Sequence, residues 1–313
     1  MTYFSRQFLY VSMATCLLLA GYASSGMAAT KPVKFAEPSW PGVNVKTEIA
    51  EQLLDTLGYQ SETTRLNLPF IYRGLAKGSV DVFLGAWLPP QKDMLEPPLK
   101  KGKIVKLGAN LTDATQGLAV PAYIWEKGIH TIKDLTDHAA EFDHKIYGIE
   151  SGSAMNQAFN EAIQNDYKGM GGWTVVASST AAMVTQVKRS VKRQNPVVFY
   201  GWKPHWMNVT LDIRYLKDGD SSDIAGITAR VLTLANAEFS EQRPNVARLL
   251  RQLHVDAAIQ SSWINKYGHK KNKKTKVAQQ WLANHGDTVT QWLKGVKTAD
   301  GGSAVAAYQK RYQ

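Results

Sequence analysis

The chain has few of the features that mark whole classes of protein. It contains one cysteine, Cys16, among 313 residues, which excludes a disulfide scaffold and a thiolate metal cluster. After the first thirty residues, no stretch approaches the roughly eighteen uninterrupted apolar residues of a membrane-spanning helix. With 44% hydrophobic and 20% charged residues, the composition excludes disorder, collagen and coiled coil. We therefore expect a globular chain, and its length favours two domains over one.

The signature motifs of common enzymes are also absent. The sequence has no His-Glu-x-x-His, no Gly-x-x-x-x-Gly-Lys-Ser/Thr, no Gly-x-Ser-x-Gly and no Gly-x-Gly-x-x-Gly. Its seven histidines show no metal-ligand spacing with a carboxylate partner. Because no nucleophile or base stands out, we expect a protein that is not an enzyme and that holds neither a metal nor a cofactor.

The first thirty residues have the pattern of an export signal. Arg6 is their only charged residue, an apolar stretch covers residues 8–20, and small residues follow it. The apolar stretch is shorter than the roughly 20 residues that a membrane anchor requires. We therefore predict a signal peptide at 1–29, cleaved after about Ala28 or Ala29, and a mature protein in the periplasm.

The mature chain carries a strong positive charge. The formal net charge of +11 falls to +10 once Arg6 is removed (11 − 1), and an excess of this size raises the possibility of an anionic partner. Much of it comes from the block at 269–276, which includes Lys270 and Lys276 and has no interleaved aromatic residue. We interpret this block as a solvated loop or helix face and, given the export signal, expect no nucleic acid partner.

The apolar pattern alternates between strand and helix. Residues 43–57 have an apolar face that repeats every three or four positions, and Ser153 and Ser179 are suitable N-cap residues for two later helices. Strands are expected at 33–36, 59–66, 80–84, 104–107, 117–121, 145–150, 173–176 and 196–200, and beyond residue 215 the chain is expected to be mostly helical. This alternation predicts an α/β fold of two lobes, each with a mostly parallel sheet flanked by helices. No flexible linker is evident, so we expect strands to join the lobes.

An aromatic ring follows four of the expected strands. The four are Trp40, Trp87, Tyr123 and Trp202. Ligands of open α/β sheets bind outside the carboxyl ends of the strands, so we expect these rings to meet in a pocket between the lobes. Several rings with few formal charges suit a quaternary ammonium, which has no N–H to donate and gains about 0.5–2 kcal/mol from each π face. Five other tryptophans are assigned to packing, namely Trp125, Trp173, Trp263, Trp281 and Trp292.

Stretches spread over the mature chain carry a family resemblance. They are Glu37–Trp40, Asp81–Pro90, Leu118–Tyr123, Lys145–Ser153 and Pro196–Asn208, with further similarity at Arg243–Val246 and Trp292–Gly302. These stretches resemble the substrate-binding proteins of ABC importers for choline and glycine betaine, and most closely the choline-binding branch. The resemblance implies a periplasmic binding protein clamshell with the ligand between its lobes. We expect lobe I to comprise residues 30–112 and 208–313, and lobe II residues 113–207.

The resemblance also implies roles for particular residues. Trp40 and Trp87 from one lobe, with Tyr123 and Trp202 from the other, would cage a trimethylammonium group. Asn156 matches a polar contact near the far end of the ligand. The implied partners are the quaternary ammonium ligand and the permease subunits of an ABC transporter, and we expect the binding protein to be a monomer.

One position departs from the family pattern. The choline binders that this chain resembles carry an aspartate two residues after the first tryptophan, and here that position is Gly42. Without the carboxylate, the site lacks a charge partner for the cation and an acceptor for the choline hydroxyl. Glycine betaine and carnitine, which carry their own carboxylate, thereby become candidates beside choline. Asn44, Ser153 and His205 could supply further hydrogen bonds, although Ser153 also suits a helix cap.

Two rival classes of function remain. An exported hydrolase of small choline-like esters would need a nucleophile and a base at the strand ends, where the sequence places rings instead. An adhesion or scaffold module would usually show repeats or a surface anchor, and the sequence shows neither. A binding protein therefore accounts best for the sequence.

Overall fold

The computed structural model describes residues 31–218 and 223–313. The signal peptide predicted at 1–29 lies outside the described residues. Within them, nine strands form one mixed sheet in the order β2-β1-β3-β9-β4-β7-β5-β6, with β8 paired to β4. No helix in this part of the chain is both long enough and apolar enough to cross a bilayer.

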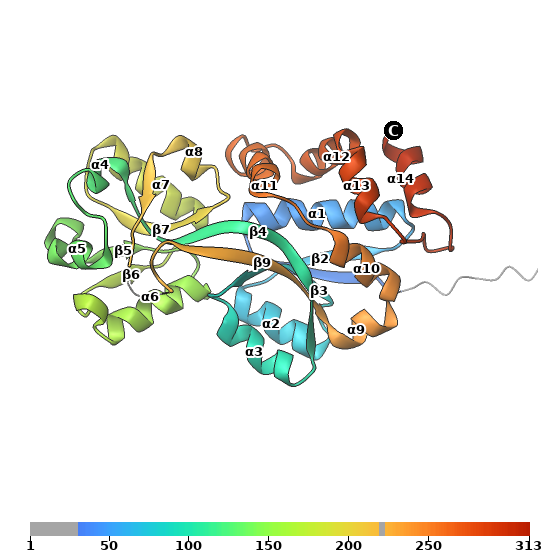
Figure 1. Ribbon diagram of the computed structural model, residues 1–313, viewed down its shortest axis with the longest axis horizontal. Coiled ribbons are helices and arrows are strands. Elements are labelled where there is room, and N and C mark those ends of the chain that lie inside the picture. The colour runs from blue at the N-terminus through green and yellow to red at the C-terminus, as the bar shows by residue number, and fades with distance from the viewer. Residues whose placement is uncertain (1–30, 219–222) are drawn as a thin grey trace, which may run out of the picture. The chain divides into compact units, whose positions relative to one another are not determined.

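The strands and helices alternate in the first part of the chain and become mostly helical at its end, as the sequence indicates (Figure 1). The strands are β1 (Val33–Glu37), β2 (Ser61–Arg65), β3 (Val82–Leu88), β4 (Ile104–Pro121), β5 (Lys145–Tyr147), β6 (Thr174–Val176), β7 (Val198–Lys203), β8 (Ile213–Tyr215) and β9 (Ile227–Asn236). The α-helices are α1 (Pro41–Thr56), α2 (Leu68–Lys77), α3 (Lys92–Lys100), α4 (Ala122–Trp125), α5 (Ile132–Asp137), α6 (Ala154–Gln164), α7 (Thr180–Lys192), α8 (Met207–Thr210), α9 (Ala237–Gln242), α10 (Pro244–Gln252), α11 (Ala257–Ile264), α12 (Lys274–Asn284), α13 (Gly286–Trp292) and α14 (Ala304–Tyr312). Short turns of other helix types are η1 (Ala139–Phe142), η2 (Tyr167–Gly169) and η3 (Asn265–His269). The predicted α/β class, a sheet flanked by helices, is confirmed.

The sheet is more mixed than the alternation suggests. β1, β2 and β3 pair in parallel, as do β5, β6 and β7. Between these two parallel parts run the long strands β4 and β9, which are antiparallel to each other and to the neighbouring strands β3 and β7. Figure 1 shows β4 and β9 side by side, extending from one group of helices to the other. The expectation that strands join the two parts of the molecule agrees with this arrangement.

Two features of these long strands differ from the sequence interpretation. The strands expected at 104–107 and 117–121 are one continuous strand, β4, and β9 was not expected at all. The polar segment between the two expected pieces stays in the ladder because the register between β4 and β9 shifts at three points, and such bulges let a strand bend without breaking the sheet. A period-two pattern interrupted by bulges is hard to recognise in a sequence.

The buried apolar side chains form two large clusters. The first core gathers residues such as Phe35, Ile49 and Phe83 from β1, α1 and β3, together with the helices near the C-terminus. The second core gathers residues such as Ile146 and Phe199 from β5 and β7 with the helices around them. A smaller cluster lies where β4 and β9 run between them. The molecule therefore has a separate hydrophobic core at each end of its longest strands.

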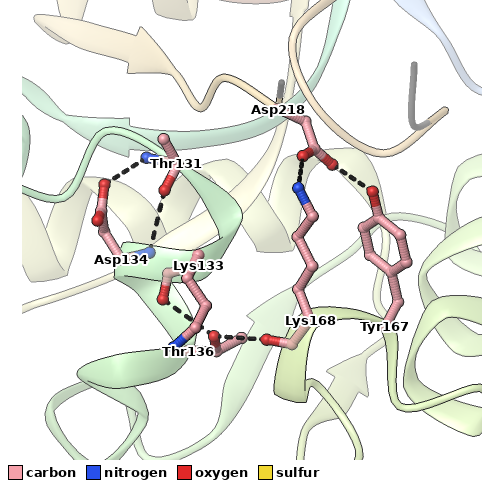
Figure 2. A network of polar contacts seen from close by, with 7 residues as sticks. All are labelled: Thr131, Lys133, Asp134, Thr136, Tyr167, Lys168 and Asp218. Carbon is pink, nitrogen blue, oxygen red and sulfur yellow. Dashed lines mark hydrogen bonds and ion pairs between the residues drawn. The ribbon is translucent and has the colours of Figure 1, made fainter. Parts of the chain in front are cut away.

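A polar network holds the outer elements of the second core together (Figure 2). At the start of α5, Thr131 and Asp134 form a capping box, in which each side chain accepts a hydrogen bond from the other residue's backbone N–H. The Tyr167 hydroxyl donates to Asp218 at 2.7 Å, and Lys168 forms an ion pair with the same carboxylate. The Thr136 hydroxyl on α5 donates to the backbone oxygen of Lys168 at 2.7 Å. These contacts join α5, η2 and the segment after β8.

Candidate functional site

Four aromatic rings line one cavity between the two cores. Trp40 lies directly before α1, Trp87 near the end of β3, and Tyr200 and Trp202 on β7. The rest of the wall is apolar or uncharged, and it includes Ser153 and the amide side chains of Gln91, Gln116 and Gln260. No charged side chain is among the residues that line this cavity. The structure thus brings three of the four predicted rings together.

Local backbone geometry explains how these rings come to face one space. Trp40 is the N-cap residue of α1, where Pro41 begins the helix and fixes the direction of the chain. Tyr200 and Trp202 are two residues apart on one strand, so both side chains leave the same face of β7. Their ring centroids are 5.0 Å apart. Trp40 also packs against both hydrophobic cores, which places it at the junction between them.

The fourth ring at the cavity is Tyr200, and the structure does not bring Tyr123 there. Tyr123 lies on α4, and its hydroxyl donates to the backbone oxygen of Asn195 at 2.7 Å. In the mostly parallel sheet that the sequence predicts for each lobe, the carboxyl ends of β4 and β7 would lie at the same edge. They are antiparallel, with Gln116 opposite Trp202 and Ala119 opposite Phe199. The end of β4 is therefore displaced from Trp202 by several residues of strand, each about 3.3 Å long.

The predicted polar residues Asn156, Asn44 and Ser153 all hydrogen-bond the protein's own backbone. Asn156 hydrogen-bonds three backbone groups of Ile149 and Glu150, with an Nδ2 to Ile149 oxygen distance of 2.8 Å, so it shapes the loop after β5. Asn44 donates to the backbone oxygen of Pro38 at 2.7 Å. Neither is among the lining residues. Ser153 does line the cavity, and its hydroxyl also caps α6 by accepting from the backbone N–H of Asn156.

His205 lies behind the rings. Its imidazole packs 4.7 Å from the Trp202 ring and 5.3 Å from Trp206, and it lines a neighbouring hollow rather than the cavity itself. Its Nδ1 accepts from the backbone N–H of Met207. Burial lowers the pKa of His205 to about 3, so the ring is neutral over the physiological range. It therefore supports Trp202 without adding positive charge near the cavity.

The space beside Gly42 is occupied by another residue. A Cβ at position 42 would lie 2.8 Å from Nε2 of Gln260 and 3.2 Å from Cδ1 of Ile264, both on α11. An aspartate at this position would need Gln260 to move. The glycine and the glutamine thus fit together. The Gln260 amide lies beside position 42, where the choline binders that this chain resembles carry an aspartate.

Comparison with known proteins decides the family. Residues 31–284 match the family model OpuAC, described as the substrate-binding domain of ABC-type glycine betaine transport systems. The chain belongs to this family. It is thus a substrate-binding component of an ABC transport system, of a kind that binds solutes outside the cytoplasm.

Several relatives of this binding protein are known. It is 32% identical to an ABC-transporter choline binding protein solved in complex with choline, with a TM-score of 0.86 over 90% of this chain and 98% of that one. It is 25% identical to a lactococcal OpuAC in its closed form with glycine betaine, with a TM-score of 0.75 over 84% and 99% of the two chains. A glycine betaine/carnitine transport binding protein of Listeria monocytogenes is 26% identical over 172 residues, which are 55% of this chain and 56% of that protein.

One carboxylate of the binding protein connects the two sides of the cleft. Glu150, in the loop after β5, accepts hydrogen bonds from the Ser39 hydroxyl at 2.6 Å and from the Trp40 indole N–H at 3.3 Å. It also accepts from the backbone and the hydroxyl of Thr180 at the start of α7. Ser39 and Trp40 lead into α1 of the first core, whereas Thr180 belongs to the second. Glu150 therefore bridges the elements of the two cores at the edge of the aromatic cavity, an arrangement that sequence motifs did not single out.

Proposed function

We propose that the protein captures a quaternary ammonium compound in the periplasm and delivers it, as a monomer, to the permease of an ABC importer. The observation that carries this proposal is the convergence of Trp40, Trp87, Tyr200 and Trp202 on one cavity without a charged side chain. Each ring face is expected to contribute about 0.5–2 kcal/mol to binding a desolvated cation. Several rings around one cation therefore add up to a substantial contribution to its binding.

The chemistry of the lining favours methylated nitrogen over a primary amine. A primary ammonium must keep its N–H groups hydrogen-bonded when it leaves water, whereas a trimethylammonium has none to satisfy. Burial raises the pKa of Tyr200, so its hydroxyl stays protonated and the ring stays neutral. The rings therefore replace the hydration of a bulky, weakly hydrated cation.

We propose further that the ligand is carried unchanged. Besides the rings, apolar groups and amides, the lining offers the Ser153 hydroxyl, which is held at the N-cap of α6. Incubation with choline esters and analysis of the products is expected to show no turnover. Release of choline by the purified protein would instead support the hydrolase.

Titration calorimetry tests the ligand class. We expect saturable binding of at least one among choline, glycine betaine and carnitine. Glycine, which has the carboxylate of glycine betaine but no methyl groups, is expected to give no binding heat. Folded protein that releases no heat with any of the three methylammonium compounds, or that binds glycine as well, would contradict the proposal.

The bridge made by Glu150 provides a separate prediction about closure. A ligand that contacts both sides favours the closed form, so an interaction present only in that form adds to its apparent affinity. Hydrogen bonds to a charged group contribute about 1.5–3 kcal/mol. We expect Glu150→Ala to weaken binding of the preferred methylammonium about tenfold or more, measured by calorimetry.

A matched control separates this effect from a general loss of charge. Glu161 is exposed on α6, away from the lining of the cavity. Glu161→Ala is expected to leave the affinity unchanged. Equal affinities of the Glu150 and Glu161 variants would show that the contacts of Glu150 do not contribute to closure.

A further inference from the structure

Gln116 presents an unused hydrogen-bond donor at the cavity. Its side chain is fully buried on β4, opposite Trp202 in the sheet register. The side-chain oxygen accepts from the Tyr200 hydroxyl at 2.7 Å, which fixes the orientation of the amide. The amide nitrogen is buried and has no hydrogen-bond partner among the described residues. A buried N–H group without a partner is costly, and a ligand that accepts from it removes that cost.

Gln260 presents a second unused amide at the same cavity. Its side chain is 3% exposed, and its oxygen is buried without a partner in the described part of the chain. The amide lies next to Gly42, in the first turn of α1. Rotation by about 180° exchanges the oxygen and nitrogen of an amide with little change in shape. Gln260 can therefore turn its N–H groups toward an acceptor.

The charges around the cavity favour a ligand that brings its own negative group. The lining residues carry no formal charge, so a simple cation such as choline would bring a net charge into the site. The acidic residue Glu150 lines an adjoining hollow rather than this cavity, and its oxygens already accept from Ser39, Trp40 and Thr180. A zwitterion is neutral overall, and its carboxylate is an acceptor that matches buried amide donors.

We propose that Gln116 and Gln260 form the polar end of the ligand site and select a methylammonium with a carboxylate tail, a betaine, over choline. This inference rests on the proposed function, because the rings must bind the cation before the amides can hydrogen-bond the carboxylate tail. The rings bind the methylated nitrogen, and the two amides distinguish what is attached to it. We expect the wild-type protein to bind glycine betaine at least about tenfold more tightly than choline, the discrimination typical of one charge-assisted hydrogen bond.

Two variants and a ligand without a tail test the inference by calorimetry. Tetramethylammonium has the methylated nitrogen alone and therefore reports on the rings. Gln116→Glu keeps an acceptor for Tyr200 but replaces the donor by a negative charge, and Gln260→Leu removes the second amide at similar volume. We expect each variant to bind glycine betaine at least about tenfold more weakly. Tetramethylammonium is expected to bind Gln260→Leu within about threefold of the wild type, and to bind Gln116→Glu no more weakly than the wild type, because the added negative charge attracts the cation. In Gln116→Glu, choline is expected to become the preferred ligand.

The outcomes separate this inference from the proposed function. Gln157 is exposed on α6, so Gln157→Glu adds the same charge outside the cavity and is expected to change none of the three affinities. If both variants lower the affinities for glycine betaine and tetramethylammonium by the same factor, the amides do not bind the carboxylate tail and the inference fails. A wild-type protein that binds tetramethylammonium but does not prefer glycine betaine over choline also overturns it, while the proposed function stands. No binding of any of these ligands by folded wild-type protein overturns both.

Discussion

Replacing Trp87 by alanine is expected to weaken binding of the preferred methylammonium at least about a hundredfold. This factor corresponds to about 2.7 kcal/mol, which combines a desolvated cation–π contact of about 2 kcal/mol with the lost apolar contact of the ring. Trp87 is only half-buried near the end of β3 and packs against the second core from its margin. We therefore expect its removal to leave the buried members of both cores in place. Calorimetry with glycine betaine and choline measures the loss, and the thermal unfolding midpoint is expected to change little.

Trp125 provides the matched control for this variant. It is also half-buried, but it lies on α4, where its ring packs 4.4 Å from His130 and outside the lining of the cavity. Trp125→Ala is expected to bind ligand like the wild type. If Trp87→Ala retained wild-type affinity and lost most of its stability, Trp87 would be a core residue and the aromatic site would be wrong.

The second large effect concerns stability rather than binding. We expect Trp292→Ala to lower the free energy of unfolding by about 3–5 kcal/mol, because it leaves a large cavity in the first core. The Trp292 ring is 1% exposed and stacks 5.2 Å from Trp281, whose edge in turn meets Trp263 at 5.1 Å. None of these three rings lines the ligand cavity.

Urea unfolding of the wild type and of Trp292→Ala measures this loss. Trp292→Phe serves as the control, since it keeps an aromatic ring in the stack and is expected to lose clearly less stability. The affinity of folded Trp292→Ala for its ligand is expected to stay close to that of the wild type. A variant with unchanged stability and lost binding would place Trp292 in the site and contradict its assignment to packing.

Much of the architecture follows from local sequence signals. The helix expected at 43–57 is α1. Ser153 and Ser179 cap α6 and α7, and each serine hydroxyl accepts a hydrogen bond from the backbone N–H three residues later. These features depend on neighbouring residues, so a sequence pattern is enough to find them. The long antiparallel pair of β4 and β9 depends on contacts between distant segments and on bulges, and neither leaves a clear local pattern.

The same distinction separates the predicted and the missed site residues. Trp40, Trp87 and Trp202 stand at element ends that the sequence locates, and the structure places them around one cavity. Tyr123 also follows a strand, but the direction of β4 relative to β7 takes it elsewhere. Tyr200 could have been found from its spacing of two residues from Trp202, which places both rings on one face of a strand. Gln116 and Gln260 could not, because only the tertiary structure shows that their amides are buried and unused.

A crystal structure of the protein with glycine betaine would show whether the four rings bind the methylated nitrogen. We expect the quaternary nitrogen within about 6 Å of the ring centroids of Trp40, Trp87, Tyr200 and Trp202, the range of a cation–π contact. We also expect the ligand carboxylate to face the amide of Gln116. A ligand bound outside this cavity, or one whose methylated nitrogen contacts a carboxylate instead of the rings, would show that the aromatic cavity is not the ligand site.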